Sequence, residues 1–168
     1  ASDNVAARTL ARNSPFGYEG FIGRMNEKAE ELGLDHTHYA DPSGLLSDNV
    51  SSARDMARLI AYAASDPRVS EVMRKSDHTL RTSRRTLTVR NTNKLIGTDV
   101  QVQGGKTGFI TRSGYCLATL LRLPQSDQQV AVVGLGAKSN AGRFMETKHL
   151  LNWVATKMPF FGASVPQG

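Results

Sequence analysis

Lys106, Thr107 and Gly108 are consecutive residues that could together bind and process a peptide. They stand in a segment whose residue pattern predicts a β-strand. The lysine would supply a fixed positive charge at the wall of a site, and the threonine hydroxyl could hold a substrate carboxylate. The glycine has no side chain, so a substrate peptide could lie against the strand edge. One tripeptide is a weak signal, and its interpretation depends on the elements around it.

The same residues could instead close a phosphate-binding loop, because that motif also ends in Gly-Lys-Thr. The motif needs a glycine five positions before Gly105, and Val100 stands there. It must also open a helix, whereas Phe109 and Ile110 continue a strand pattern. We therefore do not expect this segment to bind a nucleotide.

The elements that must position these residues can be predicted from the spacing of apolar side chains. Some segments have helical spacing, and others have the alternation typical of strands. The predicted helices cover residues 5–11, 18–32, 53–64, 69–73 and 141–157. The predicted strands cover residues 105–110, 114–121 and 129–137, after a β-ribbon that begins at Thr79. Residues 130–135 are apolar at both odd and even positions, which predicts a strand buried on both faces.

Capping and turn residues separate these elements. Ser2 or Asp3 could cap the first helix, and Gly33 would end the second. Ser52 to Asp55 has the form of a capping box. Residues 34–50 are rich in turn formers and predict a loop, which includes a second Ser-Asp-Asn at 47–49.

Length and composition limit the classes of function. The 168 residues predict one domain, or most of one, and no segment approaches the ~20 apolar residues of a membrane span. The net charge is +6, and Arg81, Arg84, Arg85 and Arg90 are concentrated in the predicted ribbon. No aromatic side chains are interleaved with them, so a solvated face is a simpler interpretation than a nucleic-acid surface.

The residues that commonly bind metals are sparse. His36 and His38 would lie on one side of a strand, but no third ligand stands in pattern with them. The single cysteine, Cys116, excludes an internal disulfide and is best interpreted as a small apolar residue. We predict neither a metal site nor a cofactor.

Short blocks of sequence occur in a fixed order along nearly the whole chain, and Ser2-Asp3-Asn4 opens the series. The further blocks are Phe21–Asn26, Leu32–Leu34, Asp41–Leu45, Ser52–Asp55, Asn91–Asn93, Gly105–Phe109 and Gly114–Leu117. In this order they resemble the low-molecular-mass penicillin-binding proteins, the D-alanyl-D-alanine carboxypeptidase and endopeptidase family of serine peptidases. The Ser-Asp-Asn variant and the short C-terminus are most similar to the endopeptidase branch.

The resemblance implies a fold and a mechanism. The fold would be α/β (α+β) and β-lactamase-like, a three-layer sandwich of an antiparallel sheet with helices on both faces, plus a helical subdomain. The chain would be the C-terminal portion of one transpeptidase-like domain, helical over 2–75, with ribbon, sheet and final helix over 76–157 and a tail over 158–168. The enzyme would cleave D-Ala-D-Ala stem peptides of peptidoglycan through an acyl-enzyme, and β-lactam antibiotics would inhibit it.

The resemblance also implies catalytic roles for three residues. Ser2 would relay the proton toward the leaving amine, and Asn4 would hold the peptide carbonyl with its amide. Lys106 would lower the energetic cost of the charge that develops during the reaction, and it would keep the reacting groups ready to react. The competing interpretation of Ser2 is that it only caps a helix.

Four further residues would bind the substrate. Thr107 would hold the terminal carboxylate beside Gly108, and the backbone N–H of Phe109 would be the second donor of the oxyanion hole. Arg143 would support carboxylate recognition near Lys106, Thr107 and Gly108. The competing interpretation of Arg143 is a surface charge on a helix.

One motif of the family has no counterpart here. No serine in the chain has a lysine three positions later, so the Ser-x-x-Lys motif with the nucleophile, the general base and the first oxyanion donor is absent. The chain could be a fragment, could pair with a separate N-terminal segment, or could be a dead homologue that binds muropeptides. We expect it to be inactive alone and to expose a large apolar surface. The family implies a periplasmic or cell-envelope location.

Overall fold

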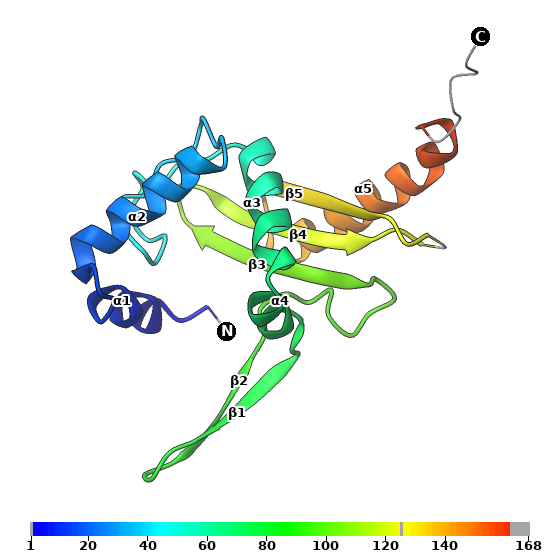
Figure 1. Ribbon diagram of the computed structural model, residues 1–168. Coiled ribbons are helices and arrows are strands. Elements are labelled where there is room, and N and C mark those ends of the chain that lie inside the picture. The colour runs from blue at the N-terminus through cyan, green and yellow to red at the C-terminus, as the bar shows by residue number, and fades with distance from the viewer. Residues whose placement is uncertain (1, 125, 162–168) are drawn as a thin grey trace.

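The computed structural model describes residues 2–124 and 126–161 and has helices on both faces of a sheet (Figure 1). The helices are α1 (Asn4–Arg12), α2 (Gly17–Glu31), α3 (Ala53–Ser65), α4 (Pro67–Arg74) and α5 (Asn140–Phe161). The strands are β1 (Asp77–Arg81), β2 (Thr86–Arg90), β3 (Val102–Ile110), β4 (Gly114–Arg122) and β5 (Gln129–Ala137). Every predicted element is present, with its ends moved by a few residues.

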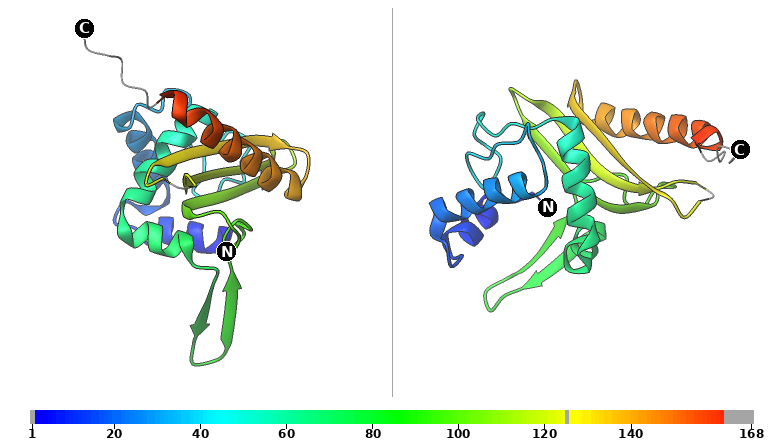
Figure 2. Two further views of the ribbon diagram at one scale, coloured as in Figure 1. Left: turned by 90° about the vertical axis from the view of Figure 1, so that its right-hand side faces the viewer. Right: turned by 45° about the horizontal axis from the view of Figure 1, so that its top comes forward.

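The sheet has the strand order β3-β4-β5, and both pairings are antiparallel. Helices α3 and α4 contact one face of the sheet, and α5 crosses the other (Figure 2). This arrangement confirms the three layers and the mixed α/β class. Within the described residues β3 pairs only with β4, so its outer edge is unpaired in this structure.

The main core lies between the sheet and α5. Its buried members come from β4, β5, α5 and the loops around them. They are Leu95, Leu117, Leu121, Leu123, Val132, Phe144 and Leu151. Burying apolar side chains of this size contributes about 1.5–3 kcal/mol each, so this layer holds β4 and β5 firmly against α5.

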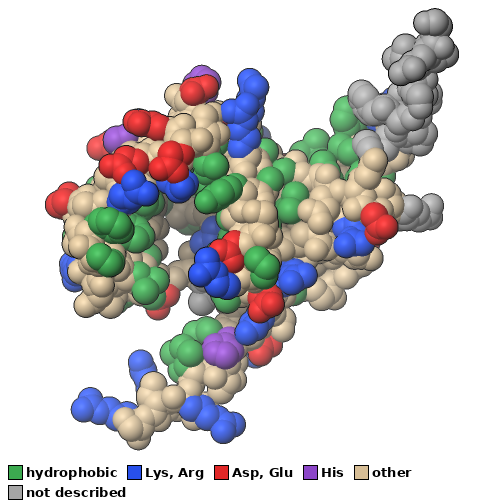
Figure 3. Space-filling model, viewed as in Figure 1, with side chains coloured by type: hydrophobic (Ala, Val, Ile, Leu, Met, Phe, Trp, Pro, Cys, Tyr) green, Lys and Arg blue, Asp and Glu red, His purple; other side chains and the backbone are tan. Residues whose placement is uncertain are grey.

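Helices α1 and α2 form a lobe beside the sheet, and the loop of residues 34–51 connects that lobe to α3. Gly33, with φ of 62°, ends α2 as its left-handed stop. Ser52 caps α3 by accepting a hydrogen bond from the Asp55 N–H at 3.1 Å. Figure 3 shows a hollow between this lobe and the rest of the molecule.

The prediction that residues 130–135 are buried on both faces is wrong for the end of the strand. Val132 is 5% exposed, but Leu135 near the end of β5 is 46% exposed. The middle of the strand lies between α3 and α5, which accounts for its apolar run. Its end passes beyond these helices and borders a pocket.

Within the parts of the chain that the structure describes, no helix combines the length and the apolar character needed to cross a bilayer.

Candidate active site

Lys106 and Ser2 meet although 104 positions separate them in the sequence. The Lys106 ammonium donates a hydrogen bond of 2.8 Å to Oγ of Ser2. β3 carries the lysine toward the start of α1, so this bond joins the sheet to the helical lobe. An ammonium and a hydroxyl at this distance can pass a proton from one to the other and on to a group bound beside them.

All seven predicted site residues border one pocket of about 280 Å³. The pocket lies where α1, the 41–49 loop and β3 come together. Its lining is Ser2, Asn4, Ser43, Gly44, Leu45, Thr92, Lys106, Thr107, Gly108, Phe109 and Arg143. The sequence therefore predicted which residues gather here, whereas their individual roles stay predictions.

The N-terminal cap of α1 leaves Ser2 free to face the pocket. Asp3 is the cap, because its Oδ1 accepts a hydrogen bond of 2.8 Å from the N–H of Ala6. The Ser2 hydroxyl accepts from Lys106 instead. The competing interpretation of Ser2 as the helix cap is thus wrong.

Thr107 is fixed by a residue that was not predicted as part of the site. Its side chain is 6% exposed, and its Oγ1 lies 2.6 Å from Oγ1 of Thr92. Either hydroxyl can donate, so a proton in this pair can be turned toward a ligand. Thr92 belongs to the Asn91–Asn93 block, and that block was the only signal for it.

Arg143 braces β3 and β4 from α5. The side chain is 7% exposed, and Nη1 donates to the carbonyls of Gly108 at 3.0 Å and Cys116 at 3.2 Å. Its guanidinium also lies over the rings of Tyr115 and Phe144. The interpretation of Arg143 as a surface charge is therefore wrong, because buried donors of this kind fix the backbone they bind.

Both cations of the pocket have a lowered pKa. The loss of hydration around Lys106, followed by the nearby charge of Arg143, lowers the pKa of the lysine below its ordinary value. Burial also lowers the pKa of Arg143, but a guanidinium stays protonated at neutral pH. Part of the Lys106 side chain is exposed, so the site has a solvent-accessible cation in front of a buried one. Such a pair favours an anionic ligand.

The loop that forms the opposite rim is organised by Asp41. This buried carboxylate accepts from Gly44 N–H at 2.5 Å, Ser43 Oγ at 3.0 Å and Asn49 Nδ2 at 3.1 Å. Burial opposes its ionisation, but these hydrogen bonds outweigh that effect and hold the pKa of Asp41 below its ordinary value. Nη2 of Arg8 in α1 lies 3.7 Å from Oδ2 of Asp41, so an ion pair links the rim to α1. Asn49 serves the loop, as predicted for the second Ser-Asp-Asn.

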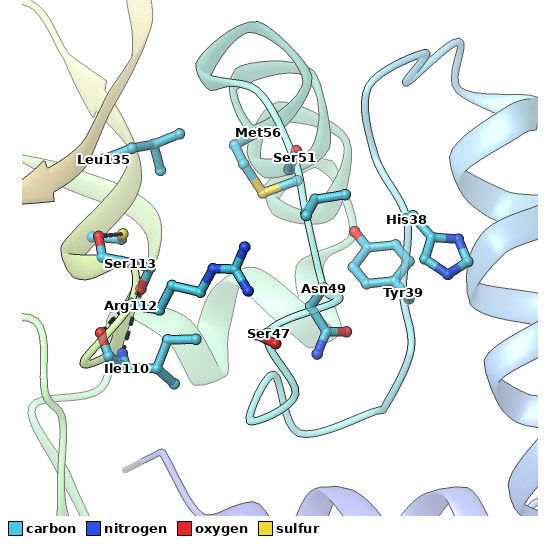
Figure 4. Close-up of a pocket in the computed structure, with 12 residues that line it drawn as sticks. His38, Tyr39, Ser47, Asn49, Ser51, Met56, Ile110, Arg112, Ser113 and Leu135 are labelled. Carbon is cyan, nitrogen blue, oxygen red and sulfur yellow. Dashed lines mark hydrogen bonds between the residues drawn. The ribbon is translucent and has the colours of Figure 1, made fainter.

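A second pocket, of about 430 Å³, lies between the 38–51 loop, α3 and the β3–β4 turn. Met56, Ile110 and Leu135 give it apolar walls from three different elements. Figure 4 shows Arg112 extending from the β3–β4 turn toward Asn49 on the opposite wall. None of the predicted site residues borders this second pocket.

Comparison with known proteins agrees with the fold and with the family resemblance. Residues 1–139 match a family described as D-alanyl-D-alanine carboxypeptidase. A D-alanyl-D-alanine endopeptidase of Escherichia coli is 35% identical over 159 residues, which are 93% of this chain and 51% of that protein. The chain thus spans about half the length of the curated relatives it matches.

Solved structures give the same result. Penicillin-binding protein D2 from Listeria monocytogenes, in its cefotaxime-bound form, is 30% identical with a TM-score of 0.77, and the match covers 93% of this chain and 62% of that one. Penicillin-binding protein 5 from Haemophilus influenzae is 30% identical with a TM-score of 0.81, over 90% of this chain and 44% of that one. This chain belongs to the D-alanyl-D-alanine carboxypeptidase family of serine peptidases, among the penicillin-binding proteins.

Proposed function

We propose that this chain supplies half of the active site of a serine-type D-Ala-D-Ala peptidase, a carboxypeptidase or endopeptidase acting on peptidoglycan. The observation that carries the proposal is the hydrogen bond between Lys106 and Ser2 across a pocket bordered by the outer edge of β3, which has no strand partner among the described residues. The family's place of action makes the periplasm or cell envelope the proposed location.

Substrate binding follows from the edge of β3. A stem peptide would add to β3 as a further strand, with its backbone hydrogen-bonded to the strand edge. Gly108 is exposed and presents no side chain to that peptide. The hydroxyl of Thr107, turned by Thr92, would bind the terminal carboxylate, and Arg143 would contribute its charge from beneath the strand.

The chemistry is acyl transfer through a tetrahedral intermediate. As the nucleophile attacks the carbonyl carbon, the carbonyl oxygen becomes an oxyanion, and the Phe109 N–H would be one of its two donors. The Asn4 amide would hold the neighbouring peptide carbonyl. Ser2 would pass a proton to the leaving amine, and Lys106 would stabilise the charge that develops along this path. Water then releases the acyl group and restores the nucleophile.

The nucleophile would come from a complementary segment that carries Ser-x-x-Lys. The second pocket and the hollow beside it provide apolar walls for such a segment. Other apolar side chains of the chain are also open to solvent, including Met145 at 58%, Leu150 at 44% and Trp153 at 58% on α5. Exposed apolar surface of this extent is typical of a face that another segment covers.

The experiment joins the chain to the residues encoded immediately before Ala1 and measures D-Ala release from a soluble D-Ala-D-Ala peptide. We expect turnover from the joined protein, none from the 168 residues alone, and a loss of about 100-fold or more in the joined Lys106→Gln variant. Turnover that does not depend on Lys106 would contradict the proposed site.

A binding protein is the second candidate, because the chain has no Ser-x-x-Lys. In that case the pocket would hold muropeptides without cleaving them. Saturable binding of a D-Ala-D-Ala peptide by the joined protein, with no D-Ala released and no β-lactam attached, is the result that distinguishes it.

A further inference from the structure

The β1–β2 hairpin projects away from the rest of the molecule (Figures 1 and 2). Every residue of β1 is exposed, and in β2 only Val89 is partly buried. A two-stranded hairpin is marginally stable by itself, so its order must come from its base. There Asn91 donates side-chain hydrogen bonds to the carbonyls of Met73 at 3.0 Å and Lys75 at 2.9 Å.

Most of the chain's excess positive charge lies on this arm, which we define as residues 74–90. It holds six of the 21 lysines and arginines but only one of the 15 acidic residues. At its tip, Arg81, Arg84 and Arg85 are all exposed. None of the ion pairs among the described residues includes these three arginines. Figure 3 shows basic side chains extending from the end of the hairpin.

The turn at the tip is closed by its own hydrogen bonds. Oγ1 of Thr82 accepts from the N–H groups of Arg84 at 3.3 Å and Arg85 at 3.0 Å. The Thr82 N–H donates to the Arg85 carbonyl at 2.9 Å. A hydroxyl that binds the following N–H groups is a common way to hold a turn. The arginines are therefore presented from a structured turn.

The arm is also continuous with the candidate active site. β2 ends at Arg90, and two residues later Thr92 borders the pocket and contacts Thr107 at 2.6 Å. Five strand residues span about 17 Å, so the tip lies well beyond the reach of the pocket itself. A ligand that touches both must be longer than one short peptide.

We propose that this arm binds carboxylates of the peptidoglycan polymer outside the stem peptide that occupies the pocket. The inference rests on the proposed function, because it takes the pocket's ligand to be part of that polymer. Stem peptides that are not cross-linked end in carboxylates, and the guanidinium fork matches a carboxylate with two parallel hydrogen bonds. The arm would raise the affinity of the protein for the polymer and would leave its affinity for short peptides unchanged.

The test is co-sedimentation of the 168-residue chain with purified insoluble peptidoglycan at low and high salt. The test variant carries Arg81→Gln, Arg84→Gln and Arg85→Gln. The matched control removes the same charge from exposed positions elsewhere, with Arg54→Gln, Lys138→Gln and Lys157→Gln. A third variant with lysine at the three tip positions keeps the charge and checks that the hairpin tolerates substitution.

We expect the tip glutamine variant to bind about tenfold more weakly at low salt, and the control to bind like the unchanged chain. The lysine variant should retain most of the binding. Converting the polymer's carboxylates to neutral amides should weaken the unchanged chain to the level of the tip variant. Equal binding by the tip and control variants, or undiminished binding to amidated polymer, would overturn the proposal. Binding to anionic phospholipid vesicles that needs the same arginines, without arginine-dependent peptidoglycan binding, would overturn it as well.

The peptidase proposal is tested separately by turnover of the soluble peptide. In the joined protein the tip substitutions should leave that turnover unchanged. If turnover is normal and the tip substitutions do not change polymer binding, only the proposed role of the arm is overturned. Arginine-dependent polymer binding without any turnover contradicts only the peptidase.

Discussion

Two glycines of β3 differ in what surrounds them, and the difference separates packing from ligand binding. A Cβ at Gly105 would lie 2.7 Å from Nδ2 of Asn93 and 2.9 Å from Oγ1 of Thr119, and both neighbours are buried. A Cβ at Gly108 would meet only the Cβ of Cys116, at an ordinary 3.5 Å. The protein itself therefore tolerates a methyl group at 108 but not at 105.

We predict that Gly105→Ala lowers the free energy of unfolding by about 1–3 kcal/mol, because buried neighbours must move. Gly108→Ala should change it by about 0.5 kcal/mol or less. Urea denaturation of both variants measures the difference. In the joined protein, Gly108→Ala should instead weaken peptide binding along β3. Equal destabilisation by the two substitutions would show that Gly108 is also a packing glycine.

At the scale of the element, α1 must hold Ser2 and Asn4 toward β3. The stability of α1 can be changed through its N-terminal cap, Asp3. We predict that Asp3→Ala weakens the helix by about 1 kcal/mol, because the Ala6 N–H loses its acceptor. Asp3→Asn should be close to neutral, since asparagine caps equally well. Hydrogen exchange of the α1 amides measures the effect. Identical exchange in the two variants would mean that the cap does not stabilise α1.

Sequence patterns were most informative about the positions of individual helices and strands. Helix spacing and cap residues predicted α2 and α3 closely, because local propensity and tertiary packing agree there. β5 was predicted in position but not in burial, since an apolar run does not reveal where the covering helices end. The hairpin's alternation predicted a ribbon, and the exposure of Leu80 at 44% and Leu87 at 43% confirms that little covers it.

At the scale of the whole molecule, two buried carboxylates tie the 34–51 loop to the helices. Asp41 binds the turn at the pocket rim. Asp55 accepts from the His36 N–H at 2.8 Å and from Thr37 Oγ1 at 2.9 Å. For each residue burial opposes ionisation, but the hydrogen bonds outweigh it and lower the pKa. A lowered pKa means that the ionised form stabilises the fold.

Because the pKa of each carboxylate is lowered in the folded protein, we predict that the protein loses stability as the pH falls. The contribution of each carboxylate is fully present above its unfolded pKa of about 3.9 and is lost as the pH falls through the lower folded value. An Asp41→Asn and Asp55→Asn variant should be less stable at pH 7 and should lose less stability below about pH 4. Urea denaturation across pH measures both effects, with the exposed Asp48→Asn as control. A variant with unchanged acid sensitivity would contradict the assignment.

The assembly of the site could not be derived from local pattern. Ser2 and Lys106 are brought together by packing between the lobe and the sheet, and no periodicity encodes that contact. Only the resemblance of ordered blocks predicted it. Thr92 and the Ser43–Leu45 rim were missed as site residues, because hydroxyl and turn residues in loops look alike whether or not they face a pocket. The brace formed by Arg143 likewise depends on a strand pairing that one helix cannot reveal.

The most direct measurement is covalent labelling by a fluorescent penicillin. We propose that this chain holds the cation, hydroxyl and amide of an acyl-enzyme site whose nucleophile comes from another segment. We expect label on the protein joined to its upstream residues, greatly reduced label in the joined Lys106→Gln variant, and none on the 168 residues alone. Label attached to a residue of the 168-residue chain by itself would contradict it.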